Sequence, residues 1–366
     1  MILLTEEQQM IRDMAAGFLS DKASVDAFRA QRNAGQSGDT SINNEMAEMG
    51  WFGMLTSEDA GGVDMGAQAA GLVAEEMGRN LTTSPFLSSA VMSAAALRVA
   101  NETEWAGKVA SGEAVVALAM DEHIKHRPDM VGTKAEASGN GFVLRGTKRF
   151  VGDGGAADRL IVTAMTDDGL GLFLIDPATD GVTVDTIKTV DNRNAANLTL
   201  DNVQVDGSAL LAKGDIAEEA LGTALRVGRS VGAAELVGVS KEAADRTVAY
   251  LKERKQFGVT LSQFQALQHR AADLYTQIQT TESVIAAALK AIDEGRDDAE
   301  RLSRVAKAKA SKTANLAVRE AVQMHGGIGM TDDLDIGLFM KKARACGEYL
   351  GDATCHAEWL LRERGV

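Results

Sequence analysis

The spacing of apolar residues changes twice along this chain, and the two changes limit the folds that it can adopt. Up to about residue 112, apolar residues recur at steps of three and four, as in 10–19, which is the period of an amphipathic helix. From about Glu113, short apolar runs alternate with turn residues. From about Ala217 the helical period returns and continues to the C-terminus. This order predicts an α+β protein whose helices and strands lie in separate domains.

The middle segment is predicted to be a compact antiparallel β domain. Turn residues separate its short apolar runs at intervals of roughly ten residues, a spacing typical of hairpin-connected strands. Residues 114–120 are a short apolar run, and the predicted strands are 141–146, 159–164, 171–175, 182–184 and 196–200. We therefore expect an N-terminal α-helical domain at 1–112, the β domain at 113–212 and a C-terminal helical domain at 213–366.

Composition and charge argue against several classes of partner. The chain has 366 residues, of which 45% are hydrophobic and 25% are charged, as in ordinary globular proteins. Its formal net charge is −14, which argues against a nucleic-acid or anionic-membrane partner because both need clustered Lys and Arg. No run of about eighteen apolar residues occurs, so no membrane span is expected.

Cysteine usage and the N-terminal sequence indicate a cytoplasmic protein. Cys346 and Cys355 are the only two cysteines, which are too few for a disulfide framework, and no spacing typical of zinc occurs. We therefore predict no metal site. The N-terminus lacks a basic segment followed by an apolar run, so no secretory signal is expected.

Two motifs in the C-terminal helical segment have the chemistry needed to contact a nucleotide. Residues 254–258 read Arg-Lys-Gln-Phe-Gly, and residues 323–331 read Gln-Met-His-Gly-Gly-Ile-Gly-Met-Thr. Arginine makes flat, bidentate contacts with phosphate, and glycines let the backbone approach a ligand closely. Neither motif belongs to a strand–loop–helix unit, so a nucleotide bound here is not bound in the Rossmann manner.

Each motif also has a purely structural interpretation. Arg254 could belong to a solvated charged face that includes its neighbours in 252–255. One glycine of the second motif could cap a helix C-terminus, although this does not explain three glycines with a flanking Gln and Thr. His325 is more often a packing residue than a ligand, and we assign it no role.

These two motifs and three earlier ones resemble landmarks of the acyl-CoA dehydrogenase family, flavoenzymes that oxidise acyl-CoA thioesters. The earlier three are Leu-Thr-Glu-Glu-Gln at 4–8, Gly-Trp-Phe-Gly at 50–53 followed by Glu-Asp-Ala-Gly-Gly at 58–62, and Glu-Glu-Met-Gly-Arg at 75–79. All five occur in the family's order and spacing, and the resemblance covers the whole chain. It implies an acyl-CoA dehydrogenase-like α+β fold: an N-terminal helical domain, a middle antiparallel β domain and a C-terminal four-helix bundle.

The resemblance also implies that FAD is the cofactor. Arg254 would contact the FAD pyrophosphate of a neighbouring subunit, with Gln256 and Phe257 beside the cofactor. In the second motif, the residues that would meet the adenosine part across the subunit interface are Gln323, Gly326 and Gly327.

In the β domain the resemblance assigns one residue and shows two departures. Phe150 holds the place of the aromatic residue that packs near the flavin ring, and Gly152 replaces the family's Thr or Ser. Residues 117–122 match the start of another landmark, but 123–130 replace the Gly-Ser-Asp that usually follows. These departures leave the flavin and acyl-thioester contacts of this subunit unassigned.

Arg229 is a candidate for binding the substrate. It lies twenty-five residues before Arg254, where the family has an arginine that faces the acyl-CoA. Arg226 and Arg229 would share one helical face, so a patch that faces an anion is physically reasonable. Two solvated arginines are the alternative interpretation.

The reaction implied by the resemblance needs a base that this chain does not have in the usual place. A carboxylate must remove the proton α to the thioester carbonyl, while hydride leaves the β carbon for the flavin. The family places this glutamate at one of two positions, which here are Leu350, before Gly351, and Gly228, before Arg229. Neither side chain can accept a proton, so the base is not identified.

Three other carboxylates lie near these two positions in the sequence. Asp352 is two residues past Leu350, but a turn or capping role explains it more readily. Glu235 lies two helical turns beyond Gly228, and Glu348 would point to another face of its helix. Asp352 and Glu235 are the candidates that we retain.

The C-terminal sequence resembles one branch of the family in particular. Residues 339–342 and 350–356 are similar to small subunits of two-component acyl-CoA dehydrogenases, such as the pimeloyl-CoA and steroid side-chain types. In such heteromers one subunit can supply the base while the other completes the FAD site. The resemblance implies a homodimer, a homotetramer or a heterotetramer with a related subunit, and electron-transfer flavoprotein as the electron acceptor.

Three functions are compatible with this sequence. The first is an acyl-CoA dehydrogenase subunit that converts an acyl-CoA thioester into the enoyl-CoA. The second is a non-catalytic subunit that completes the FAD site of a heterotetramer. The third is a flavin monooxygenase on the same fold, which does not need the glutamate.

Overall fold

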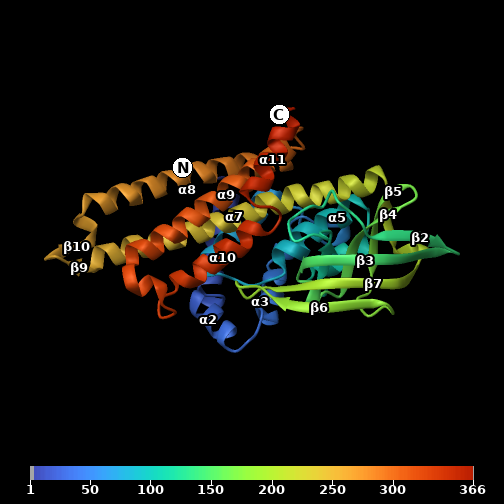
Figure 1. Cartoon of the computed structure of the whole chain (residues 1–366), viewed down its shortest axis with the longest axis horizontal. Coiled ribbons are helices and arrows are strands. Elements are labelled where there is room, and N and C mark those ends of the chain that lie inside the picture. Colours follow the sequence, from blue (N-terminus) through green and yellow to red (C-terminus); the bar gives the residue numbers. More distant parts are fainter. Residues whose placement is uncertain (1–3, 366) are drawn as a thin grey trace. The chain divides into compact units, whose positions relative to one another are not determined.

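The predicted order of helices, strands and helices is present in the structure, a computed structural model that describes residues 4–365. The elements are labelled in Figure 1. They divide into a helical unit and a second unit that contains the main sheet. The helical unit consists of the described parts of 1–35 and 229–366 together with 67–82, and the second unit consists of 36–66 and 83–228. The expected domain boundaries near residues 112 and 212 stay a prediction.

The first helices begin where capping rules place them. Helix α1 (Glu6–Lys22) has Thr5 as its N-cap. Thr5 Oγ1 accepts a hydrogen bond from Gln8 N at 3.2 Å, and Gln8 Oε1 accepts one from Thr5 N at 3.1 Å, which is the reciprocal capping box. Helices α2 (Val25–Asn33) and α3 (Thr40–Glu48) follow.

The remaining N-terminal helices flank a break at Pro85. Pro85 is the N-cap of η3, a π-helix, because proline has no backbone N–H to donate inside a helix. The helices are α4 (Gly66–Asn80), η3 (Phe86–Ser93), α5 (Ala94–Val99) and α6 (Thr103–Ala110), with short 3-10 turns η1 (Trp51–Gly53) and η2 (Glu58–Ala60).

The middle of the chain forms one eight-stranded sheet that is mainly antiparallel, as predicted. Across the sheet the order is β6-β7-β3-β2-β4-β5-β8, and β1 pairs with β4. The strands are β1 (Val116–Ala119), β2 (Lys134–Ser138), β3 (Gly141–Gly152), β4 (Arg159–Thr166), β5 (Gly169–Ile175), β6 (Val182–Lys188), β7 (Asn194–Asp206) and β8 (Leu210–Lys213). Strand β1 is the main exception, since it runs parallel to β4.

A core of aliphatic side chains holds this sheet together. Leu160, Val162 and Ala164 of β4 have no exposed surface, and their alternate spacing places them on one face of the strand. The rings of Phe142 and Phe173 meet edge to face with centroids 5.2 Å apart. Burying each large apolar side chain contributes about 1.5–3 kcal/mol to folding.

Long helices make up the C-terminal part. They are α7 (Asp215–Glu253), α8 (Gln265–Asp293), α9 (Ala299–His325), α10 (Ile336–Glu348) and α11 (Ala353–Glu363). Helix α9 packs against α8, α10 and α11 (Figure 1). Its inner face carries Ala306, Ala310 and Ala314, all fully buried, and these small side chains let the neighbouring helices approach closely. The predicted four-helix bundle corresponds to α7–α10, with α11 as an additional helix.

Despite the length of these helices, none within residues 4–365 has an apolar stretch sufficient to cross a membrane.

Candidate functional site

The motif at residues 254–258 forms a β-hairpin directly after α7. Strands β9 (Lys255–Gln256) and β10 (Val259–Thr260) pair antiparallel, with only Phe257 and Gly258 between them. Their φ angles are +55° and +83°, and a two-residue turn of this kind needs positive φ at both central residues. Phe257 is 91% exposed. The turn therefore holds an aromatic ring in solvent on a well-defined backbone.

Arg254 lies at the base of this hairpin, and its side chain is exposed. Its backbone N donates to Tyr250 O at 2.9 Å, and its O accepts from Leu261 N at 2.8 Å. Within the described residues, the exposed guanidinium of Arg254 has no hydrogen-bond or ion-pair partner. Gln256 is also exposed, and its Nε2 donates to Lys255 O at 2.8 Å. The backbone is fixed, while the Arg254 side chain is available to an anion.

The glycine-rich motif begins at the C-terminus of α9. Gly326 N donates to Gln323 O, and Gly326 has φ +67° and ψ −143°, a combination that essentially only glycine adopts. Gln323, Gly326 and Gly327 are exposed. Apart from each glycine and its chain neighbours, no heavy atom of the described residues lies within 4 Å of the place where a Cβ would stand at Gly326 or Gly327. One glycine does end the helix, as the structural interpretation required, and the backbone beside it is open to a ligand.

Tyr250 and His325 bring the two motifs to the same end of the helical unit (Figure 1). Their ring centroids are 4.4 Å apart, and Tyr250 Oη donates to His325 O at 3.4 Å. Tyr250 lies four residues before Arg254, and His325 directly precedes Gly326. Burial lowers the pKa of His325. The packing role predicted for His325 is confirmed, and Tyr250 is a partner that sequence reasoning missed.

In the second unit, Phe150 sits at an irregularity in β3. The pairing of β3 with β7 shifts between Lys148 and Val151, and Phe150 has φ +52° and is 48% exposed. Its backbone N donates to Asn197 Oδ1 at 3.3 Å. A bulge of this kind redirects a side chain, so the ring assigned to the flavin contact is presented to solvent in this unit.

The segment that departs from the family pattern is tied to the sheet by two acidic residues. His126 Nδ1 lies 2.8 Å from Asp121 Oδ2. Glu122 accepts hydrogen bonds from Thr133 N at 3.0 Å and from Lys148 Nζ at 2.6 Å. Burial lowers the pKa of Lys148 to about 8, although Glu122 opposes that shift. Residues 123–130 therefore follow their own hydrogen-bonded path in place of the usual Gly-Ser-Asp.

Arg229 is buried, so the interpretation of two solvated arginines is wrong. It is 1% exposed, and its Nη1 donates to Glu300 Oε1 at 2.9 Å. Arg304 Nε donates to the same oxygen at 2.6 Å. Burial lowers the pKa of Arg229 to about 10. Among the described residues, the Nε of Arg229 has no acceptor, which leaves one buried donor for a ligand. Arg226 is half-buried and pairs with Glu219 of its own helix.

The two expected base positions are built from apolar and backbone atoms. Leu350 is 2% exposed and has φ +61°, and Gly351 has φ +94°. Buried Lys307 donates its Nζ to Gly347 O and Gly351 O, both at 3.0 Å, and this fixes the turn that holds Leu350. Gly228 is a buried residue of α7. A side chain that could remove a proton is missing from both positions.

The nearby carboxylates have structural partners. Asp352 is the N-cap of α11, and its Oδ1 accepts from the N–H three residues later at 2.8 Å, so its capping role is confirmed. Glu235 is buried, with its Oε1 2.6 Å from Nζ of buried Lys342. Glu348 pairs with Arg344 at 3.0 Å. A carboxylate paired with a lysine or arginine is a poor proton acceptor.

Three domain models of one protein family match most of this chain. The acyl-CoA dehydrogenase N-terminal domain matches residues 5–113, the middle domain matches 117–203, and the C-terminal domain matches 219–363.

Two curated relatives match this chain over nearly its full length. A 3-(aryl)acrylate reductase of Clostridium sporogenes is 27% identical over 367 residues, covering 96% of each chain. A probable acyl-CoA dehydrogenase of Bacillus subtilis, YngJ, is 28% identical over 380 residues, covering 99% of this chain and 98% of the relative.

Solved structures match equally completely. A variant of the Tcur3481-Tcur3483 steroid ACAD is 31% identical, with a TM-score of 0.87 and coverage of 97% and 96% of the two chains. The ChsE4-ChsE5 complex of Mycobacterium tuberculosis is 25% identical, with a TM-score of 0.90 and coverage of 99% and 98%.

Proposed function

The chain belongs to the acyl-CoA dehydrogenase family, whose enzymes use FAD, and from this we propose that it is a dehydrogenase subunit that lacks its own catalytic base. The reaction is the α,β-dehydrogenation of an acyl-CoA thioester to the enoyl-CoA. The observation that carries the proposal is buried Leu350 at the expected base position, together with the structural partners of the nearby carboxylates.

The exposed motifs of the helical unit fit the chemistry of FAD. The exposed guanidinium of Arg254 suits a pyrophosphate, and the open backbone at Gly326 and Gly327 lets a nucleotide approach closely. When bound, FAD supplies the hydride acceptor. Because the Arg254 guanidinium has no partner among residues 4–365 and Gly326 and Gly327 are exposed at the same end of the helical unit, we propose that they hold the FAD of a neighbouring subunit, in a dimer or a larger assembly.

The remaining roles follow from the chemistry of single side chains. Arg229 keeps a buried Nε–H without an acceptor among residues 4–365, so we propose that it donates to the acyl-CoA. Leu350 contributes an apolar wall, which excludes water but moves no proton. The proton α to the carbonyl must therefore leave to a group from another chain.

We propose that this other chain is a related subunit of a heterotetramer in the cytoplasm. Two of the similar structures bear the names of two-protein assemblies, Tcur3481-Tcur3483 and ChsE4-ChsE5. The sequence at 339–342 and 350–356 resembles small subunits of that kind. Electron-transfer flavoprotein is the proposed acceptor of the electrons from the reduced flavin.

Flavin absorbance under anaerobic conditions tests this function. We expect an acyl-CoA to bleach the flavin only when the chain is mixed with a partner subunit that carries the base, because proton removal needs that carboxylate. FAD uptake only with the partner, and no bleaching even then, would instead identify a non-catalytic subunit. Product formation that depends on oxygen would identify a monooxygenase.

A substitution tests the FAD contact independently of turnover. Arg254→Ala should lower FAD retention at least about tenfold, because it removes one or two charge-assisted hydrogen bonds worth about 1.5–3 kcal/mol each. FAD content is measured after gel filtration, and light scattering checks the assembly. Arg362→Ala is the matched control, since Arg362 is an exposed arginine of α11. Equal FAD content in both variants would remove Arg254 from the site.

A further inference from the structure

The glycine-rich motif needs support from outside its own sequence if its backbone is to keep one conformation. Glycine loses more conformational freedom on folding than any other residue, and three glycines lie within the short helix η7 (Gly326–Met330). The contact between Tyr250 and His325 fixes the side of the motif that follows α9. The other side, where the chain passes from the motif into α10, needs a second anchor.

Two aspartates that follow the motif provide this anchor through arginines of α2. Asp332 is the first residue after the motif, and Asp335 is the N-cap of α10. Arg32 binds the Asp332 carboxylate at both oxygens: its Nη1 donates to Oδ1 at 2.8 Å and its Nη2 donates to Oδ2 at 2.6 Å. Arg29 lies one helical turn earlier. Its Nη1 donates to Asp332 O at 2.7 Å, and its Nη2 donates to Asp335 Oδ1 at 2.6 Å.

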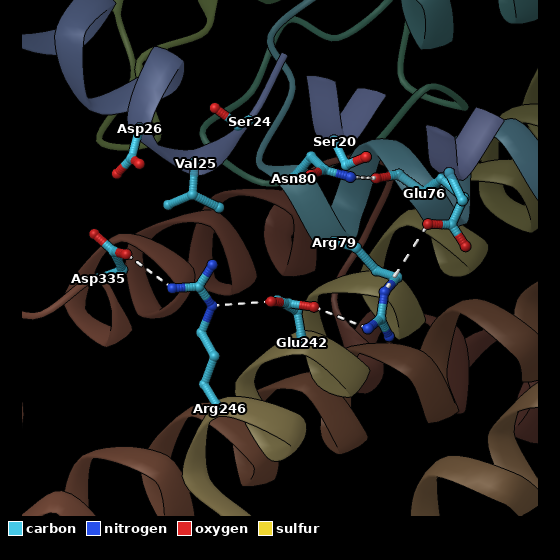
Figure 2. A pocket seen from close by; sticks show the side chains of 11 residues that line it. Ser20, Ser24, Val25, Asp26, Glu76, Arg79, Asn80, Glu242, Arg246 and Asp335 are labelled. Atoms are coloured by element: carbon cyan, nitrogen blue, oxygen red, sulfur yellow. Dashed lines mark hydrogen bonds and ion pairs between the residues drawn. The ribbon is translucent and has the colours of Figure 1, made fainter. Parts of the chain in front are cut away.

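A third arginine, Arg246 of α7, binds the same anchor. Its Nη1 donates to Asp335 Oδ2 at 2.8 Å, a contact that Figure 2 shows. Asp335 therefore accepts hydrogen bonds from α2 and from α7, and its side chain is only 21% exposed. Arg246 lies four residues before Tyr250, so one stretch of α7 contacts both sides of the motif.

The geometry of this network makes it stronger than an ordinary surface ion pair. An isolated exposed pair contributes little, but a bidentate arginine–carboxylate pair within a network of several charges is an exception. The hydrogen bonds from Arg32 lower the pKa of Asp332 to about 2, so this carboxylate is ionised at neutral pH although it is exposed. All members of the network belong to the helical unit. The network thus ties the end of the glycine-rich motif to α2.

We propose that Arg29 and Arg32 are positioning residues for the cofactor, which hold the motif at 323–331 in the conformation that meets FAD without touching FAD themselves. This inference rests on the proposed function, in which the motif meets the adenosine part of FAD. A loop that is ordered before binding loses less conformational entropy when its ligand binds. Without the two arginines, the cost of ordering the glycines would fall on FAD binding, and FAD would be held less tightly.

FAD retention by the purified full-length holoprotein, measured after gel filtration, tests this role. Arg32→Ala should lower FAD retention by about 2- to 30-fold, the range typical of a residue that acts on a ligand through a network. Arg296→Ala is the matched control. It removes an ion pair of 2.7 Å with Asp298 in the turn before α9, at the opposite end of that helix from the motif. This control should retain FAD as the wild type does.

Rescue variants separate positioning from a general loss of stability. Arg32→Lys keeps the charge but not the bidentate geometry, so its FAD retention should lie between those of the wild type and Arg32→Ala. Arg32→Asp should lose more FAD than Arg32→Ala, because two carboxylates then face each other. Adding Asp332→Arg to Arg32→Asp exchanges the charges of the pair and should restore most of that loss. Melting of the FAD-free protein by circular dichroism checks that each variant is folded.

Comparison with Arg254→Ala distinguishes failure of this inference from failure of the proposed function. If Arg254→Ala loses FAD and Arg32→Ala retains it as the wild type does, the positioning role is overturned while the FAD assignment stands. If both variants retain FAD, both proposals are overturned. A loss in Arg32→Asp that the charge exchange does not reverse would also contradict the positioning role. If Arg32→Ala does not fold, Arg32→Lys replaces it, and FAD retention equal to that of Arg296→Ala would then overturn the role.

Discussion

Purified alone, this chain should dehydrogenate straight-chain acyl-CoAs about 10²–10⁴-fold more slowly than a related enzyme with a glutamate at the position of Leu350. General-base catalysis contributes about that factor, and the structure offers no substitute at the turn. The measurement is the anaerobic rate of flavin bleaching per bound FAD, which separates the chemical step from loss of cofactor.

Leu350→Glu should recover part of this deficit, provided that FAD and acyl-CoA are bound. Leu350→Gln is the matched control, because glutamine has nearly the same shape as glutamate but does not act as a base. The backbone at residue 350 already has φ +61° with a non-glycine side chain, so glutamate adds little backbone strain there. Robust turnover by the wild-type chain alone would sink the missing-base proposal, and Asp352→Asn and Glu235→Gln would then be the next variants to assay.

Lys342→Met should destabilise the protein by about 3–5 kcal/mol, because it leaves Glu235 as an uncompensated buried charge. Glu235 is 6% exposed and Lys342 has no exposed surface, and the two groups are 2.6 Å apart. Urea unfolding at saturating FAD measures the change, with Lys341→Met as the control. Lys341 is the exposed neighbour in α10, where a substitution should change the free energy of unfolding by about 0.5 kcal/mol or less.

The double variant separates charge from packing. Glu235→Leu with Lys342→Met removes both charges, so it should be far less destabilising than Lys342→Met alone. Equal unfolding free energies for Lys342→Met and Lys341→Met would show that the buried pair is not coupled. Glu235→Gln also breaks this buried pair and can unfold part of the protein. A rate measured for that variant must therefore be divided by the fraction of protein that is folded.

Local patterns were sufficient to predict the fold class and most of the sheet. Five strands are predicted from short apolar runs between turn residues, and the run at 160–164 is fully buried. The exposed strand β2, Lys-Ala-Glu-Ala-Ser, has only one buried residue and gives no such signal. The parallel pairing of β1 with β4 joins Val116 to Arg159, and no local pattern encodes a partner that far along the chain.

In the candidate site, too, the sequence shows local features but not contacts between residues that are far apart along the chain. The motifs at Arg254 and Gly326 were visible as residue types in sequence, and so was the missing carboxylate at Leu350. The burial of Arg229 was not, because its partner Glu300 lies 71 residues away. Lys307, 44 residues before Gly351, gave no sign of holding that turn, since a lysine in a helix is usually solvated.

The contact between Tyr250 and His325 affects how tightly a cofactor is bound by the two motifs together. The two rings join the end of α7 to the end of α9. They therefore keep the two motifs at a fixed separation, and a cofactor that contacts both motifs is bound at two linked points. Once one motif has bound the cofactor, the other motif meets it at an effective concentration that depends on their fixed separation and not on the concentration of cofactor in solution. Each motif can then be weak by itself while the pair retains the cofactor. A substitution that removes the Tyr250 ring contact should therefore lower cofactor retention by more than the loss of the contacts of either motif alone would predict.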